Sequence, residues 1–372
     1  MKPNFRFYDN RQKYLMFVNT CSEKWVVAQR LAQELDNITP KPPALRFFDA
    51  GVGDGTVLSR FLRVMHRRFE RLPFYIAAKE ISLEDIRLTL DKMPDRFFEH
   101  PEMVLALTNL PYADAPWLTS RDGAKPVVWK EVALTGATAA DFERQILELQ
   151  PFLADHWRTR VSEKTGVLLP ETPTVLVLYR QDCRFILDQV IPREGSAKAD
   201  FDLVLASQPF RLRAETKFKA GRVLAPLARA LGPGGRMLGI HSAGNDPGHE
   251  IVRQVWPDED PFDTPGKAML DAVRDALGEE AREFAFEPAT GEPLRYQMHT
   301  LPDEIDSAEA QIGTSTLLAA WNAATYVAQI EDDRLAQAMS NSAYLDATRA
   351  VLKKHGALWF DDESYLVVRK PK

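Results

Sequence analysis

Three glycines at alternate positions are the feature of the sequence that most directly indicates a ligand site. The segment FFDAGVGDGT (47–56) places Gly51, Gly53 and Gly55 between an apolar run and a helical pattern. Without a Cβ, such a turn can bend sharply and let a ligand approach the backbone. A nicotinamide dinucleotide turn requires a third glycine at position 56, where this chain has Thr56. The spacing therefore argues against a nicotinamide dinucleotide and does not by itself identify another ligand.

The glycine turn belongs to an alternating series of predicted strands and helices. Its strand is LRFFDAG, its helix spans 56–71, and further strands follow in PFYIAAKEIS, EMVLALTNLPY, FDLVLASQPF and GPGGRMLGIHS. Alternation of this kind predicts an α/β fold with a parallel, doubly wound sheet. The end of the chain, HGALWFDDESYLVVRK, predicts a strand, a tight acidic turn and a second strand, which together form a C-terminal hairpin.

The alternation also divides the chain into four parts. The sheet-forming core takes three separate segments, and the stretches between them are rich in Pro, Gly and charge or are helical in pattern. The predicted parts are an N-terminal helical lid at 1–44, a core at 45–112, 200–242 and 355–372, an insertion at 113–199, and a mainly helical substrate cover at 243–354.

The G-x-G-x-G spacing, with Asp49 two residues before the first glycine, resembles the first motif of class I S-adenosylmethionine-dependent methyltransferases. FDLVLASQPF and LARALGPGGRMLGI resemble the fourth and fifth strand motifs of the same family. The resemblance implies a mostly parallel seven-stranded sheet and S-adenosyl-L-methionine as methyl donor. In the family an acid ends the second strand and holds the ribose hydroxyls, as Glu80 would here. The implied cofactor-binding residues are Asp49, Gly51, Gly53, Gly55, Glu80, Asn109, Leu110 and Ser207.

Two tetrapeptides resemble the Asn/Asp/Ser-x-Pro-aromatic motif that amino-methyltransferases carry after strand four. Asn109-Leu110-Pro111-Tyr112 matches better by letters, and Ser207-Gln208-Pro209-Phe210 matches better by position. Asn109 ends the third predicted strand, where the family places Asp or Asn against the adenine of its own cofactor. Ser207 and Phe210 then face the methyl group, as a polar group and a wall. A plain strand end with a proline at its edge is an equally good interpretation.

His241 ends the fifth predicted strand, at the edge of the sheet where such folds bind ligands. An imidazole there could take a proton from an acceptor, or it could bond a loop carbonyl. His241, Asp246, His249 and Glu250 match no zinc spacing, so no metal site is predicted. Aromatic residues before the core, such as Tyr14 and Trp25, form either a lid over the cofactor or part of the core.

Composition restricts the partners. The net charge of −6 opposes a long phosphate backbone as ligand, so nucleic acid is not the expected partner. Cys21 and Cys183 are the only cysteines, which suits the reduced thiols of a cytoplasmic protein. The sequence shows neither a signal peptide nor an apolar run long enough to span a membrane. The oligomeric state is left open.

These observations together predict a methyltransferase that moves a methyl group by SN2 to nitrogen or oxygen of a small-molecule acceptor. An already activated donor asks the protein mainly to align the reactants and exclude water. Three alternatives stand beside it. They are an N-methyltransferase that acts on a protein or nucleic-acid amino group through 207–210, a nicotinamide oxidoreductase, and a catalytically silent protein that binds S-adenosylmethionine.

Overall fold

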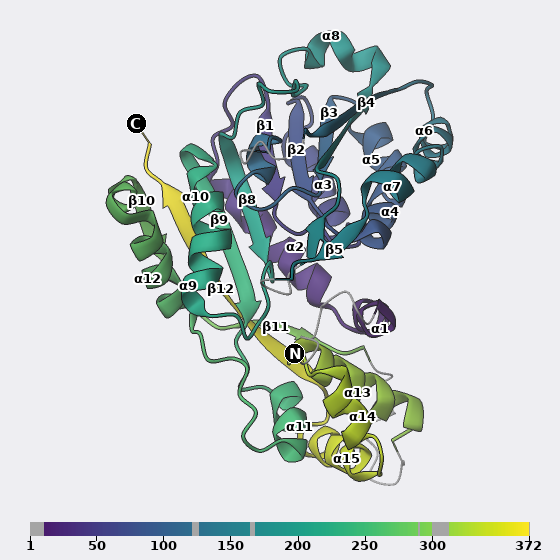
Figure 1. Ribbon diagram of the computed structural model, residues 1–372, viewed down its shortest axis with the longest axis vertical. Coiled ribbons are helices and arrows are strands. Elements are labelled where there is room, and N and C mark those ends of the chain that lie inside the picture. The colour runs from purple at the N-terminus through teal and green to yellow at the C-terminus, as the bar shows by residue number, and fades with distance from the viewer. Residues whose placement is uncertain (1–10, 121–125, 164–167, 289–290, 300–311, 372) are drawn as a thin grey trace.

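The computed structural model describes residues 11–120, 126–163, 168–288, 291–299 and 312–371. Its centre is one mixed sheet of ten strands, in the order β10-β12-β9-β8-β1-β2-β3-β7-β4, with β11 paired to β12. Figure 1 shows this sheet in the upper part of the molecule and a helical group below it, at the far end of β12. The strands are β1 (Leu45–Asp49), β2 (Phe74–Lys79), β3 (Met103–Thr108), β4 (Val128–Leu134), β7 (Thr174–Arg180), β8 (Phe201–Ser207), β9 (Leu231–Ser242), β10 (Phe284–Glu287), β11 (Leu294–Gln297) and β12 (Trp359–Arg369).

The inner strands run parallel and reverse their order once. β1 pairs with β2 on one side and with β8 on the other, and β2–β3 and β8–β9 continue outward in parallel. When the strands β3, β2, β1, β8 and β9 are numbered one to five along the chain, their spatial order is 3-2-1-4-5. This is the order of a doubly wound fold, whose ligands bind outside the carboxyl ends of the strands, at the point where the order reverses. Here that point lies between β1 and β8. The predicted α/β class and the mostly parallel sheet are therefore confirmed.

Seven strands, β3, β2, β1, β8, β9, β12 and β10, account for the expected seven-stranded sheet, and three more extend it. β7 lies antiparallel against β3 and carries β4 as the outermost strand, so the segment 113–199 contributes to the sheet. β5 (Thr159–Val161) and β6 (Leu168–Pro170) form a separate small sheet. β10 pairs antiparallel with the C-terminal half of β12.

The predicted C-terminal hairpin is wrong. Residues 359–369 form one continuous strand, β12, antiparallel to β9, and its first half also pairs with β11. The acidic residues that suggested a turn have partners in other segments of the fold, which their positions in the strand bring within reach. Asp361 forms an ion pair with Arg295, and Glu363 accepts a hydrogen bond from the Gly266 amide at 2.7 Å.

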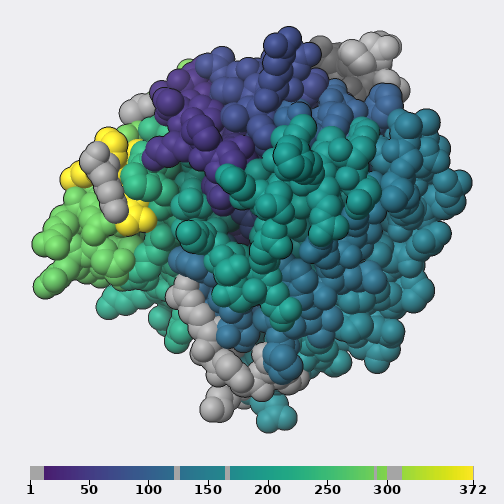
Figure 2. Space-filling view, turned by 90° about the horizontal axis from the view of Figure 1, so that it is seen from above, coloured from purple at the N-terminus to yellow at the C-terminus, as the bar shows by residue number. Residues whose placement is uncertain are grey.

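Helices cover both faces of the sheet. One face packs against α2 (Glu23–Glu34), α3 (Thr56–Arg68), α4 (Leu83–Asp91), α5 (Pro94–Glu99), α6 (Ala139–Leu147) and α7 (Gln150–His156). The other packs against α8 (Arg184–Leu187), η4 (Ala220–Leu224), α10 (Ala225–Arg229) and α12 (Gly266–Leu277), and the short α9 (Thr216–Lys219) leads into η4. Figure 2 shows green residues beside the yellow C-terminal end at the left of the view. Blue-to-teal residues, from the first half of the chain, fill the right of the view.

A third cluster joins the beginning of the described chain to the helices near its end. Phe17 of α1 (Arg11–Thr20) packs against Tyr326 of α13 (Thr314–Val327), with ring centroids 4.8 Å apart. α11 (Pro247–Val255), α14 (Asp332–Ala338) and α15 (Ala343–His355) complete this group. Within the described residues, no helix is both long and apolar enough to cross a membrane.

Candidate functional site

The glycine turn connects β1 to α3 and is open at its first glycine. Gly53 and Gly55 have φ of +55° and +76°, which side-chain-bearing residues rarely adopt. A Cβ on Gly55 would also lie 2.8 Å from Thr89, and one on Gly53 would lie 3.0 Å from the Tyr14 hydroxyl. A Cβ on Gly51 would meet nothing within 4 Å. Gly53 and Gly55 are thus required by the fold, whereas Gly51 faces open space at the carboxyl edge.

Glu80 holds the glycine turn in place. Its carboxylate is buried and accepts three backbone hydrogen bonds, from Gly53 N at 2.9 Å, Ile81 N at 2.7 Å and Ser82 N at 2.8 Å. A carboxylate has about four lone-pair sites, so one remains on the oxygen that faces Gly53. The residue therefore stands beside the turn, as predicted, but it can accept from one ribose hydroxyl and not from two.

Asp54 places a carboxylate at the N-terminus of α3. Its Oδ1 accepts from Thr56 N at 3.3 Å, and its Oδ2 accepts from the Thr56 hydroxyl. Tyr14 Oη lies 3.3 Å from Oδ1, and Lys92 Nζ lies 3.4 Å from Oδ2. Burial opposes ionisation, yet the Lys24 charge and the Thr56 bonds outweigh it and hold the pKa of Asp54 below its usual value. An ionised carboxylate therefore occupies the position where a dinucleotide fold binds pyrophosphate.

Asp49 is a second buried carboxylate at the turn. Its Oδ1 accepts from Gly51 N at 3.2 Å, and only 2% of the residue is exposed. Burial raises its pKa to about 7, against the opposing effects of the Gly51 amide and Lys24. Asp49 consequently titrates near neutrality, which is unusual for a carboxyl group.

Asn109 and Leu110 follow β3 but lie inside the protein. The Asn109 amide donates to His156 O at 3.1 Å and to Thr172 O at 3.0 Å, and its oxygen accepts from Thr174 N at 2.8 Å. Leu110 is fully buried in the hydrophobic core. The side chain of Asn109 thus fastens the segment before β7 to β3. The expectation that it binds the adenine of a cofactor needs correction, because both of its donors and its acceptor already have backbone partners.

The two tetrapeptides contact each other. Tyr112, the last residue of the first, donates its hydroxyl hydrogen to Pro209 O of the second at 2.6 Å. The amine of Lys79, at the end of β2, lies 4.6 Å from the centre of the Tyr112 ring. Tyr112 therefore supports the loop after β8, a role that the sequence motif alone does not indicate.

The loop after β8 starts with a strained residue. Gln208 has φ of +49°, and non-glycine residues held in this region often occur at functional sites. Its backbone N–H donates to Ile240 O at 2.9 Å, and its side-chain amide donates to Ser242 Oγ at 2.9 Å. Ser207 ends β8 directly across the reversal point from β1. The loop 207–210 is thus pinned between β8 and β9, beside the glycine turn's strand.

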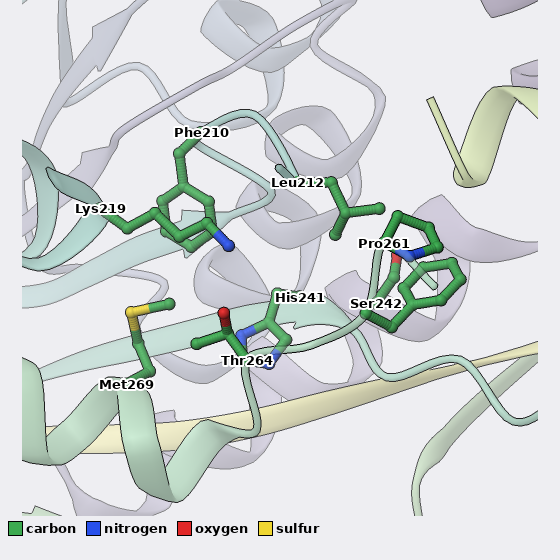
Figure 3. A pocket seen from close by; sticks show the side chains of 9 residues that line it. Phe210, Leu212, Lys219, His241, Ser242, Pro261, Thr264 and Met269 are labelled. Carbon is green, nitrogen blue, oxygen red and sulfur yellow. The ribbon is translucent and has the colours of Figure 1, made fainter. Parts of the chain in front are cut away.

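His241 lines a small cavity next to that loop. Figure 3 shows it with Phe210 and Lys219 around the same space, and the remaining lining residues are Leu212, Ser242, Pro261, Phe262, Thr264 and Met269. Neither ring nitrogen of His241 has a hydrogen-bond partner among the described residues, and Nε2 lies 3.7 Å from Glu363. The structure thus places Phe210 and His241, two residues predicted for the acceptor side, around one cavity.

The polar residues after His241 have other tasks. Asp246 caps α11 by accepting from His249 N at 2.8 Å and also accepts from Asp361 N at 3.0 Å. His249 Nε2 lies 3.2 Å from Glu259 O. In the described part of the chain, no group of three or more His, Cys, Asp or Glu residues could hold a metal ion.

Three residues of this region were not singled out from the sequence for the roles they have here. Asp54 lies within the glycine segment, and an acid just before Gly-Thr at a helix start was its available signal. Tyr14 was one of several aromatics predicted to form either a lid or part of the core, and its contact with Asp54 was missed because it depends on how α1 folds back. Nothing in the sequence distinguishes Lys219 from the exposed Lys217 on the same short helix.

Comparisons with known proteins give only distant similarities. No protein-family model matches the chain, and no curated protein matches it. Among solved structures, a Galdieria sulphuraria protein described as a sarcosine dimethylglycine methyltransferase has 8% identity, covers 93% of this chain and 85% of its own, and gives a TM-score of 0.37. Phosphoethanolamine N-methyltransferase 2 of Haemonchus contortus has 12% identity, with 100% and 60% covered and a TM-score of 0.35.

An S-adenosylmethionine-dependent methyltransferase from Clostridium acetobutylicum has 9% identity, with 94% of this chain and 92% of the other covered and a TM-score of 0.28. TM-scores this low do not indicate which cofactor or acceptor this chain binds. The assignment of a function has to depend on the chain's own strand order and on the residues around its glycine turn.

Proposed function

We propose that this protein is an S-adenosylmethionine-dependent methyltransferase that acts on nitrogen or oxygen of a small-molecule acceptor. The observation that carries the proposal is the Asp54 carboxylate at the N-terminus of α3, beside an open Gly51. Dinucleotide folds use this helix end to bind a pyrophosphate. An ionised carboxylate there repels phosphate groups. It tolerates a nucleoside ligand that carries no phosphate and has a positively charged sulfur.

The residues around the turn fit such a ligand. Gly51 leaves room for close approach, Glu80 has one remaining acceptor site for a ribose hydroxyl, and Asp49 supplies a carboxyl group near the positive end. All three stand at the carboxyl edge of the sheet, next to the point between β1 and β8 where the strand order reverses. When bound, the cofactor supplies a methyl group already activated by the sulfonium charge.

The protein's own residues would then align the acceptor and exclude water. Ser207 ends β8 and Gln208 begins the loop after it, opposite the glycine turn, and this fixed loop gives the acceptor a rigid boundary. An amine acceptor needs only to lose a proton, whereas a hydroxyl acceptor needs a base. His241 is the candidate for that base, because its ring is buried beside Phe210 and makes no hydrogen bond within the described chain.

Calorimetry with S-adenosylhomocysteine and with NAD tests the cofactor. We expect saturable binding of the first, with loss of most of the affinity in Gly51→Arg, whose side chain would fill the open space. Ser59→Arg on α3 serves as the control for an added arginine away from the turn. Binding of NAD in preference to S-adenosylhomocysteine would overturn the proposal and favour an oxidoreductase.

Labelled methyl transfer into a pool of small metabolites tests the reaction itself. Incorporation that depends on the protein and falls with Gly51→Arg supports a small-molecule acceptor. Transfer into protein or nucleic acid alone would favour the alternative substrate class that uses 207–210. Binding of S-adenosylhomocysteine without transfer into any pool would instead indicate a catalytically silent protein.

A further inference from the structure

Lys219 is a buried cation without a counter-ion. Only 2% of the residue is exposed, and among the described residues no carboxylate lies within ion-pair distance of its ammonium group. The centre of the Phe210 ring is 5.4 Å from Nζ, and the Asp263 carboxylate acts on the ammonium group only from beyond ion-pair distance. An unpaired charge in such a position is costly unless something compensates for it. Lys219 thus has an unfilled requirement for an anion.

The same cavity holds a second buried group, His241, whose Nε2 lies 3.7 Å from the Glu363 carboxylate. His241 is 4% exposed, and both of its ring nitrogens lack hydrogen-bond partners within the described chain. Figure 3 shows the Lys219 amine, the His241 ring and the Thr264 side chain directed toward a common space. The two nearby carboxylates also accept hydrogen bonds from other groups. Glu363 accepts from Gly266 N at 2.7 Å, and Asp263 accepts from the Thr264 hydroxyl at 2.9 Å.

We propose that Lys219 and His241 form a binding site for one carboxylate of the methyl acceptor. In this arrangement the Lys219 ammonium and a His241 ring N–H donate to the same anionic group. The cavity has a free volume of about 10 Å³, room for about one water-sized atom. One carboxylate oxygen therefore fits inside, while the remainder of the acceptor lies outside it, along Phe210.

The position of the cavity connects this site to the loop where transfer is proposed. Phe210 and Ser242 line the cavity, and Ser242 Oγ accepts the side-chain hydrogen bond of Gln208 at 2.9 Å. An acceptor held by Lys219 and His241 would thus have its other end beside Gln208, and in this arrangement His241 binds the acid group and is not the base for the reacting atom. This inference rests on the proposed methyltransferase function and makes it more specific, because it predicts acceptors that carry an acid group.

A nuclear magnetic resonance titration with sodium acetate, at ionic strength held constant with a bulky sulfonate, tests the site directly. The His241 ring signal, identified by its loss in His241→Gln, should shift saturably. Lys219→Met should weaken acetate binding at least tenfold, while Lys217→Met, an exposed lysine of the same helix, should stay within twofold of the unaltered protein. A shift that is linear in acetate, or equal in Lys219→Met, would overturn the proposal.

Inorganic phosphate distinguishes a free anion from an acceptor's acid group. Phosphate binding tighter than that of acetate and of larger monocarboxylates would identify a free-anion site and overturn the acceptor assignment. Calorimetry with S-adenosylhomocysteine on Lys219→Met separates the two proposals, because its affinity should be unchanged. If the unaltered protein binds S-adenosylhomocysteine but not acetate, only the carboxylate site is overturned. If it binds acetate but not S-adenosylhomocysteine, the methyltransferase function is overturned, and the role of the site in holding an acceptor falls with it.

His241→Gln separates binding of the anion from proton transfer. Glutamine retains an N–H donor but cannot act as a base. If His241 is an anion ligand, His241→Gln should keep acetate affinity within a few-fold, as measured by protein fluorescence or calorimetry, whereas His241→Phe should lose it. Equal loss in both variants would contradict donation from the ring.

Discussion

The Asp54 carboxylate accepts a hydrogen bond from Thr56 N at 3.3 Å, in the first turn of α3. This contact gives one helix-terminal N–H group the protein's own negative charge as its acceptor, and that charge disfavours a phosphate at the same helix end. The ligand chemistry of the glycine turn thus depends on a residue that stands between two of its glycines. Glycine spacing alone does not reveal that preference.

Asp54→Asn should change ligand selectivity more than it changes folding. Asparagine keeps an oxygen that can accept from Thr56 N and removes the charge, so the unfolding free energy should fall by about 1 kcal/mol. Binding of ADP, absent or very weak in the unaltered protein, should become measurable by calorimetry. Thr56→Ser, which keeps the hydroxyl that donates to Asp54, is the matched control. Equal ADP affinity in the unaltered protein and Asp54→Asn would show that the carboxylate does not exclude phosphate.

Gly51→Ala and Gly55→Ala should separate binding from stability. A Cβ on Gly55 meets Thr89 at 2.8 Å at a φ of +76°, so this variant should lose more than about 1 kcal/mol of unfolding free energy. A Cβ on Gly51 meets nothing, so Gly51→Ala should unfold in urea like the unaltered protein and bind S-adenosylhomocysteine more weakly. Unchanged affinity in Gly51→Ala would place the ligand away from this glycine.

Asn109→Ala should act on stability alone. The substitution removes the acceptor of Thr174 N and leaves the Thr174 hydroxyl as the one side-chain donor to His156 O and Thr172 O, at a cost of about 1–3 kcal/mol. Urea denaturation measures this loss, and calorimetry under conditions where the variant is folded should give an unchanged affinity for S-adenosylhomocysteine. A large loss of cofactor affinity in folded protein would restore Asn109 to the binding site.

The local sequence predicts the parts of this molecule that depend on neighbours along the chain. Alternating strands and helices and the glycine turn are such parts, because an apolar run, a helix pattern and a missing Cβ each act within about ten residues. The sheet core and the placement of Gly51 and Glu80 at one edge followed from these signals. The same reasoning predicts the carboxyl edge as the place for Ser207 and His241.

Side-chain partnerships between distant segments were not predictable. Asn109 has the right letters for a ligand contact, yet it bonds the residues before β7, which are more than 60 positions away in sequence. The acidic residues of β12 were interpreted as a turn because their partners, such as Arg295 and Gly266, come from unrelated segments. Lys219 became notable only when its burial and its lack of a counter-ion could be seen together.

Asp49 should make both stability and cofactor binding depend on pH near neutrality. Burial raises its pKa from 3.8 to about 7, so the folded protein binds this proton more tightly than the unfolded chain does. The corresponding stability is fully present below about pH 4 and is lost as the pH rises through 7. Its size is on the order of a few kcal/mol at most. Asp49→Asn should remove this part of the pH dependence in urea denaturation.

The affinity for a positively charged cofactor should depend on pH in the opposite direction to the stability. A ligand with a positive sulfur and ammonium group interacts best with the ionised Asp49, so its binding should release a proton. The affinity for S-adenosylmethionine should therefore rise between pH 6 and pH 8, and Asp49→Asn should flatten that rise. Asp202, whose pKa burial raises to about 6, stands away from the turn, at the other end of β8. Asp202→Asn should alter the stability profile while leaving the binding profile intact, and a flattened binding profile in that variant would contradict the role of Asp49.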